Sequence, residues 1–166
     1  MYEAVNDFIL QYTDVEQDKL FRGYQNRSTL PQVNDYTIYY AQAKNRIGTN
    51  VYDYEDTKVI STALFEHTIN IDFCGSNREK LEERATHLAI LAHSFLGCDF
   101  FKNHGVTLNF AEDVQYLPFT DEEQQYIHRY RIVIHLTSWD AVVLPQQTAN
   151  VINPTIENVD VHHKAI

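Results

Sequence analysis

Residues 61–75 read STALFEHTINIDFCG, and this stretch decides the fold. Its odd positions include the apolar residues Phe65, Ile69, Ile71 and Phe73, and its even positions include the polar residues Glu66, Thr68, Asn70 and Asp72. Successive side chains of a β-strand point to opposite faces, so the pattern predicts a strand that Gly75 ends. One face is apolar, and we therefore expect a sheet with one covered face.

The sequence pattern after this strand predicts a helix, which would cover the apolar face of the strand. Ser76 and Glu79 match a capping box, in which each side chain pairs with a free backbone N–H of the first turn. Gly97 is a natural C-terminal stop. One apolar stripe at spacings of four and three is formed by Leu81, Ala85, Leu88, Ala92 and Phe95. This helix is expected to lie across the apolar face of the sheet.

Shorter patterns place the remaining elements around this pair. Before the central strand we expect a helix over 2–12, a short strand or extended segment within 19–25, a strand around 36–40 and a loop or extended hairpin arm over 45–56. After the helix we expect a linker in which Phe100 and Phe101 fill one edge of the core, and short strands over 106–110 and 114–117. A long strand over 125–137 and an extended segment over 141–161 follow. The order predicts an α+β fold, a mainly antiparallel sheet with helices on one face in two layers. Residues 1–140 are assigned to this domain and residues 141–166 to a C-terminal arm.

Composition restricts the partners. The 166 residues suit one domain. They include 23 acidic and 13 basic residues, so the net charge of −10 disfavours a surface that grips nucleic-acid phosphates. The 11 tyrosines and 9 phenylalanines suit either a Tyr-rich β core or a protein interface. The N-terminus is not expected to be a signal peptide, and no apolar stretch is long enough to cross a bilayer, so we expect synthesis in the cytosol and no membrane.

The histidines do not form a convincing ligand set. His87 and His93 are six positions apart on the predicted helix, whereas helical ligand pairs need four. His128 and His135 fall on opposite faces of their strand. The adjacent histidines at 162–163 could bind a metal adventitiously. We expect no metal site and no cofactor.

Catalytic groups are equally scarce. The glycines are single, so there is no phosphate loop, and no nucleophile elbow exists. The carboxylates at 121–123 are interpreted as a solvated turn. Cys74 and Cys98 are interpreted as free thiols, although the sequence leaves a disulfide between them open, and a packing role is expected for Cys98. No catalytic residue is predicted, and a small metal-dependent enzyme remains the alternative from another class.

Polar and aromatic segments outside the predicted core are candidates for contacts with partner subunits. Neutral amides and one arginine suit hydrogen bonds between subunits, although ordinary exposed loops have the same composition. The candidate interface residues are Gln25, Asn26, Arg27, Tyr52, Tyr54, Pro145, Gln146 and Gln147.

Five short segments, in this order and spacing, carry a resemblance. They are Arg22-Gly23-x-Gln25-Asn26-Arg27, then Asp72-Phe73-x-Gly75 before a helix, Cys98-Asp99-Phe100-Phe101, Glu123-Gln124-Gln125-Tyr126 and Pro145-Gln146-Gln147. From about residue 2 to residue 160 the chain resembles a family of bacteriophage neck (tail terminator) proteins, found chiefly in phages with contractile tails. It departs from the family at Cys74, where an aromatic residue is common, and after Val161.

The resemblance implies a structural role without catalytic residues. The fold would be similar to the tail terminators of long-tailed phages, whose small α+β subunits form a hexameric ring that ends the tail tube and presents a surface to the head connector. The implied partners are further copies of the chain, the tail tube protein, the head connector or completion proteins and the sheath protein. DNA would pass through without specific binding. Another ring of the head–tail junction, a head-completion or tube-like protein, is the nearer alternative.

Overall fold

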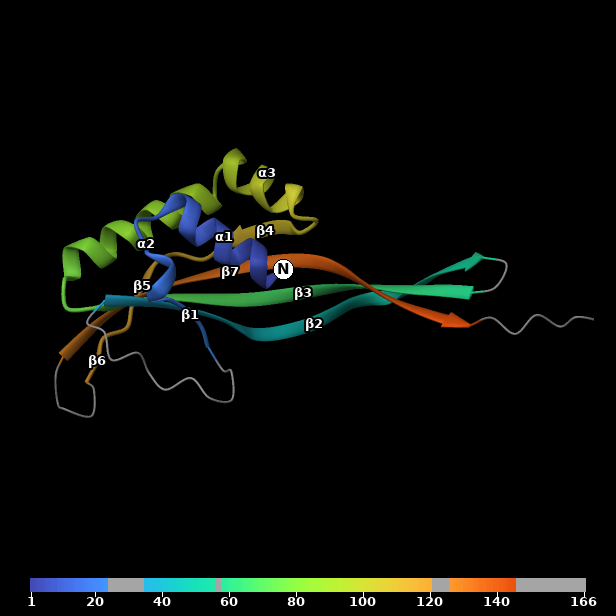
Figure 1. The fold of residues 1–166 in the computed structure, drawn as a ribbon, viewed down its shortest axis with the longest axis horizontal. Coiled ribbons are helices and arrows are strands. Elements are labelled where there is room, and N and C mark those ends of the chain that lie inside the picture. Colours follow the sequence, from blue (N-terminus) through green and yellow to red (C-terminus); the bar gives the residue numbers. More distant parts are fainter. Residues whose placement is uncertain (24–34, 56–57, 121–125, 146–166) are drawn as a thin grey trace, which may run out of the picture.

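The computed structural model describes residues 1–23, 35–55, 58–120 and 126–145 (Figure 1). In chain order the elements are the helix α1 (Tyr2–Tyr12), the 3-10 turn η1 (Gln17–Lys19), the strands β1 (Leu20–Arg22), β2 (Asp35–Glu55) and β3 (Lys58–Gly75), the helices α2 (Arg78–Ala92) and α3 (Phe95–Asn103), and the strands β4 (Thr107–Ala111), β5 (Gln115–Tyr116), β6 (Phe119–Thr120) and β7 (Tyr126–Pro145).

The strands form one open sheet in the order β1-β2-β3-β7-β4, and β5 and β6 also pair with β7. β1 runs parallel to β2, and every other described pair is antiparallel. β3 lies in the middle and pairs along its whole length with β7, from Lys58 opposite Pro145 to Gly75 opposite His128, without a register shift.

The three helices cover one face of this sheet, and the core lies between the two layers (Figure 1). The odd positions of β3 and the even positions of β7 supply its floor, with six fully buried side chains, Ile69, Ile71, Phe73, Ile132, Ile134 and Leu136. The helix α2 contributes Leu81, Ala85 and Leu88 from the stripe that the sequence predicts. The predicted α+β class and two-layer arrangement are therefore confirmed.

Aromatic rings close the core at the end where α1 meets α3. The Phe8 ring packs against Phe101 at 4.8 Å and against Phe100 at 5.3 Å between centroids. Both partners are buried, as predicted, but they lie on the helix α3 and not in a linker. Their burial anchors α1 over the sheet.

The end of the predicted helix is wrong, because the chain turns there and begins α3. Phe95 starts the new helix and is 75% exposed, so it does not extend the buried stripe. Gly97 is buried inside α3, where a Cβ would come within 2.4 Å of the Leu91 carbonyl oxygen. Glycine therefore allows a close approach of two helices here and does not stop one. Cys98 is exposed on α3, which contradicts its predicted packing role, and both cysteines are free thiols.

The polar face of β3 is also more buried than a sheet with one covered face implies. Asp72 is only 5% exposed and accepts hydrogen bonds from Arg131 Nε at 2.6 Å and Nη2 at 2.8 Å. Arg131 Nη2 also donates to the Tyr40 hydroxyl at 2.7 Å. Asn70 is buried and donates to Gln42 at 3.1 Å. The hydrogen bonds of the Asp72 carboxylate and of Asn70 Nδ2 offset the burial of these groups, whereas Asn70 Oδ1 is buried without a hydrogen-bond partner among the described residues.

A buried arginine ties the helical layer to the chain segments on either side of β1. Arg84 of α2 donates two hydrogen bonds to Asp14, one of them at 3.0 Å, and another at 2.8 Å to Asp35. These hydrogen bonds lower the pKa of Asp14 to about 2. Charge-assisted hydrogen bonds of this bidentate kind are the strong ones in proteins.

The N-terminus of α2 is capped by a side chain other than the predicted one. The N-cap residue is Asn77, whose side chain accepts a hydrogen bond from the Lys80 N–H at 3.1 Å, so the predicted capping box starting at Ser76 is wrong. Replacing Asn77 with Ala is expected to lower the free energy of unfolding by about 1 kcal/mol, because the Lys80 N–H loses its partner. Ser76→Ala, measured in the same urea titration, should leave it nearly unchanged. Equal losses from both variants would contradict this cap.

The Arg84–Asp14 pair predicts a loss of stability in acid. Because the folded pKa of Asp14 lies below its usual value of 3.8, the pair contributes fully above that value and its contribution disappears as the pH falls towards 2. Unfolding titrations between pH 5 and 2 should therefore show a smaller pH dependence for Asp14→Asn than for the natural chain. In an Arg84→Met background the same Asp14 substitution should change the pH dependence much less. An Asp14→Asn variant with the natural pH profile would contradict the pair.

Candidate assembly surface

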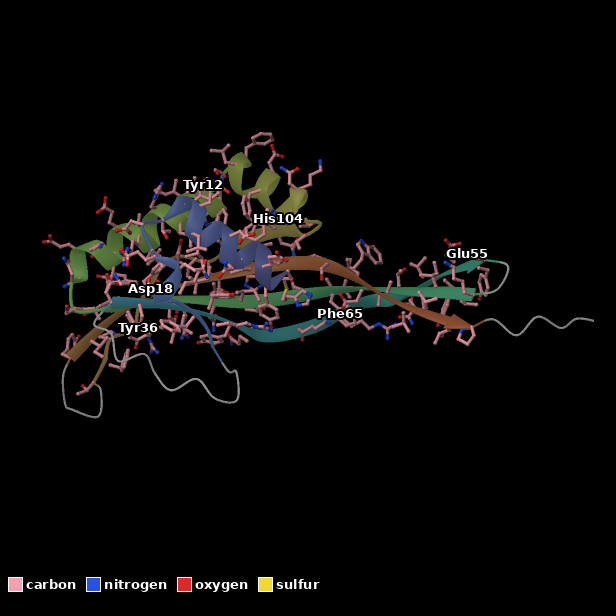
Figure 2. All side chains as sticks on the ribbon, in the orientation of Figure 1. Tyr12, Asp18, Tyr36, Glu55, Phe65 and His104 are labelled. Carbon is pink, nitrogen blue, oxygen red and sulfur yellow. The ribbon has the colours of Figure 1, made fainter. Side chains whose placement is uncertain are left out.

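Three strands continue beyond the helical layer and form a projecting arm (Figure 1). We define the arm by register as residues 46–55 of β2, 58–65 of β3 and 138–145 of β7, from the row of Arg46, Phe65 and Ser138 to the tip. Figure 2 shows Phe65 at the beginning of the arm and Glu55 near its tip. Of the two interpretations that the sequence left open for 45–56, the hairpin is therefore the one observed.

The hairpin β2–β3 is irregular on the β2 side. The register shifts between Ile47 and Val51, where β2 forms a bulge. Gly48 lies in this bulge with a φ of 76°, a backbone conformation that favours glycine. Asn50 joins the bulge to the central strand by donating to the Ser61 hydroxyl at 2.9 Å. The bulge thus bends β2 without separating it from β3.

Polar contacts fix the base of the arm. Lys44 forms an ion pair with Asp140 at 2.5 Å and lies 4.3 Å from the centre of the Phe65 ring. His67 and Ser138 are hydrogen-bonded at 2.9 Å. Burial lowers the pKa of His67, which favours a neutral ring beside the Lys44 ammonium. The arm therefore leaves the body in a defined direction.

Large apolar side chains are exposed along the arm. Eight of the fourteen exposed in the described ranges lie here: Ile47, Val51, Tyr52, Tyr54, Trp139, Val142, Val143 and Leu144. By strand register, four of them continue the core face of the sheet, namely Tyr52, Tyr54, Val142 and Leu144. The other four are on the opposite face. Monomeric proteins rarely expose a continuous apolar surface of this kind, which marks a site of contact with other proteins.

The predicted interface residues are only partly described. Tyr52 and Tyr54 are exposed on one face of the arm, with ring centroids 6.5 Å apart. Pro145 ends β7 at the arm's tip, opposite Lys58. The other predicted residues, Gln25, Asn26, Arg27, Gln146 and Gln147, lie outside the described residues. The role of all eight stays a prediction.

The apolar residues contributed by β7 were missed as site residues. The signal was the uncharged apolar run Ala141-Val142-Val143-Leu144, which follows Trp139 and Asp140. It falls where a C-terminal arm was predicted, but β7 crosses residue 140 without a break and carries the run into the sheet. The division of the chain at residue 140 stays a prediction.

Other kinds of site find little support in the described ranges. The described residues include no cluster of three or more His, Cys, Asp or Glu side chains able to bind a metal ion. Two open depressions lie on the described surface, one of about 380 Å³ at the base of the arm and one of about 530 Å³ beside Arg84. None of the helices described is both long and apolar enough to span a membrane.

Comparison with known proteins agrees with an assembly role. No curated protein matches the chain. A family described as phage neck terminator protein matches residues 1–163, nearly the whole sequence. Proteins of such a family are structural proteins of the virion that associate with other head and tail proteins. The chain, with its helix-covered sheet and projecting apolar arm, belongs to the phage neck terminator protein family.

Proposed function

We propose that this chain forms a closed ring of six copies at the neck of a contractile-tailed phage, where the ring ends the tail tube and joins it to the head connector. The arm is the observation that carries this proposal. Its apolar side chains lie on both faces of the three strands. The body of the same chain lies at one end of the arm, so it covers neither face. Copies of the chain placed side by side would cover them.

The geometry of the arm suits a ring better than an isolated pair. A ring of more than two copies needs two different surfaces on each subunit, one of which meets the other on the next copy. The arm offers two different faces and projects from the body, so that it can reach a neighbour (Figure 1). Burial of a large apolar side chain contributes about 1.5–3 kcal/mol, and several such side chains per copy are available.

The charge of the chain agrees with a ring through which DNA passes. With a net charge of −10 the subunit repels phosphates, so a channel built from it would not retain the DNA. The partners proposed are further copies of the chain, the tail tube protein, the head connector or completion proteins, and the sheath protein. No cofactor is required for this role. A different ring of the same junction is the alternative, and it would bind the connector without binding the tube end.

Removal of apolar groups from the arm tests the ring. In the natural chain, mass photometry should detect six-copy particles. The double substitution Trp139→Ser and Val143→Ser should weaken assembly roughly a hundredfold, because two buried apolar side chains are lost. The free energy of unfolding of the monomer should change by less than about 1 kcal/mol, since both side chains are exposed in it. Ile90→Ser, which removes an equally exposed apolar group from α2, is the matched control and should assemble normally.

The function is tested in the same experiment by adding tail tubes. The natural chain should bind tube ends, and a phage carrying the double substitution should accumulate filled heads separate from tubes of uncontrolled length. A chain that stays monomeric at every concentration and does not bind tube ends would overturn the proposal. Binding to connectors alone would favour the alternative ring.

A further inference from the structure

The outer edge of β7 is unpaired along the arm. Strands β4, β5 and β6 pair with β7 over residues 126–137. In the described ranges no strand pairs with the outer side of β7 from residue 138 to residue 145. The backbone N–H and C=O groups that point outward there form a template for another strand.

This edge lacks the features with which proteins protect free strand edges. The opposite edge of the arm, on β2, carries a bulge and the charged residues Arg46, Asp53 and Glu55. The β7 edge has a regular register and a single charge, Asp140, which is already paired with Lys44. Long, regular and apolar edges are the ones that accept an added strand.

The chain contains a segment of suitable length and composition to fill this edge. Beyond Pro145, residues 154–161 read PTIENVDV, which is eight residues, as many as the unpaired stretch 138–145. Three are β-branched apolar residues, Ile156, Val159 and Val161, which favour strands. The proline is compatible with an added strand because such a strand is itself an edge strand, where proline is tolerated.

We infer that residues 154–161 of a neighbouring copy pair with residues 138–145 of β7 as an added fourth strand of the arm. This inference rests on the proposed ring and specifies what joins its subunits. The edge of β7 and the segment 154–161 are two different parts of the chain, so the same exchange can repeat around a closed ring. Each copy then both donates and accepts a strand.

The connecting residues favour a neighbour over the chain's own arm. Residues 146–153, QQTANVIN, connect β7 to this segment and contain no glycine. A return onto the same β7 strand would make all eight of them one hairpin loop, longer than the two to five residues usual in β-hairpins. Fully extended, these eight residues span about 26 Å, enough to lead from the tip of one arm to an adjacent one.

Pro154 fixes which backbone groups of the added strand face β7. Since proline has no N–H, its nitrogen must point away from the partner strand. In a strand the N–H direction alternates, so residues 156, 158 and 160 also point away, and residues 155, 157 and 159 donate to β7. Proline substitutions should therefore act with a period of two.

Hydrogen exchange on the full-length protein tests this inference. Every second amide within residues 139–144, namely those that point away from β3, should be protected in the ring and should exchange freely at concentrations where the chain is monomeric. Glu157→Pro and Val159→Pro should each remove this protection and weaken assembly by about tenfold or more, since a strand-pairing N–H is lost. Asn158→Pro and Asp160→Pro are the matched controls and should keep both. Val159→Ala separates the loss of the N–H from the loss of the side chain, and should keep the protection.

The possible results separate this inference from the ring itself. Rings in which the outward-pointing amides of residues 139–144 exchange freely would overturn the added strand and leave the ring standing. Protection of these outward-pointing amides that persists in the monomer would mean that the chain covers its own edge, which also overturns it. Proline effects without the period of two would do the same. If no oligomer forms at any concentration, both the ring and the added strand are contradicted.

Discussion

The rest of the structure depends on the unbroken antiparallel pairing of β3 with β7. The two strands stay in one register from the core to the tip of the arm, so side-chain direction is conserved over the whole length. In the body this places Ile69, Ile71 and Phe73 under the helices. In the arm the same alternation leaves apolar side chains on both faces without cover. One ladder therefore produces both the stable domain and the surface that requires a partner.

The body is stabilised independently of the arm. The aromatic contacts of Phe8 with Phe100 and Phe101 close the core, and Arg84 fastens α2 to Asp14 and Asp35. At the arm's base, Lys44 and Asp140 join the two outer strands across β3. A rigid body with a well-anchored arm loses little conformational freedom when copies associate, which favours repeated identical contacts. This separation also allows substitutions in the arm to affect assembly alone.

Much of the fold was predictable from the sequence, because long elements have clear periods. The alternation in β3 and the stripe of α2 were both correct up to Ala92. Beyond it, the stripe continued by chance to Phe95, and Gly97 imitated a helix stop although it serves a close helix contact. Ser76 and Asn77 are both good caps, so only the structure decides between them. Tyr52 and Tyr54 were identified as candidate residues, but the arm joins them to Val142 and Leu144, about 90 residues away, and local patterns do not reveal such pairings.

The central claim, that the arm becomes buried when copies associate, is tested most directly by the fluorescence of Trp139. It is the single tryptophan of the sequence and is 60% exposed on the arm, so its emission reports only on this surface. Emission and acrylamide quenching would be followed through a dilution series while particle mass is recorded. We expect the emission to shift to shorter wavelength and quenching to fall as six-copy particles form. Six-copy particles in which Trp139 stays as accessible as in the monomer would contradict the claim.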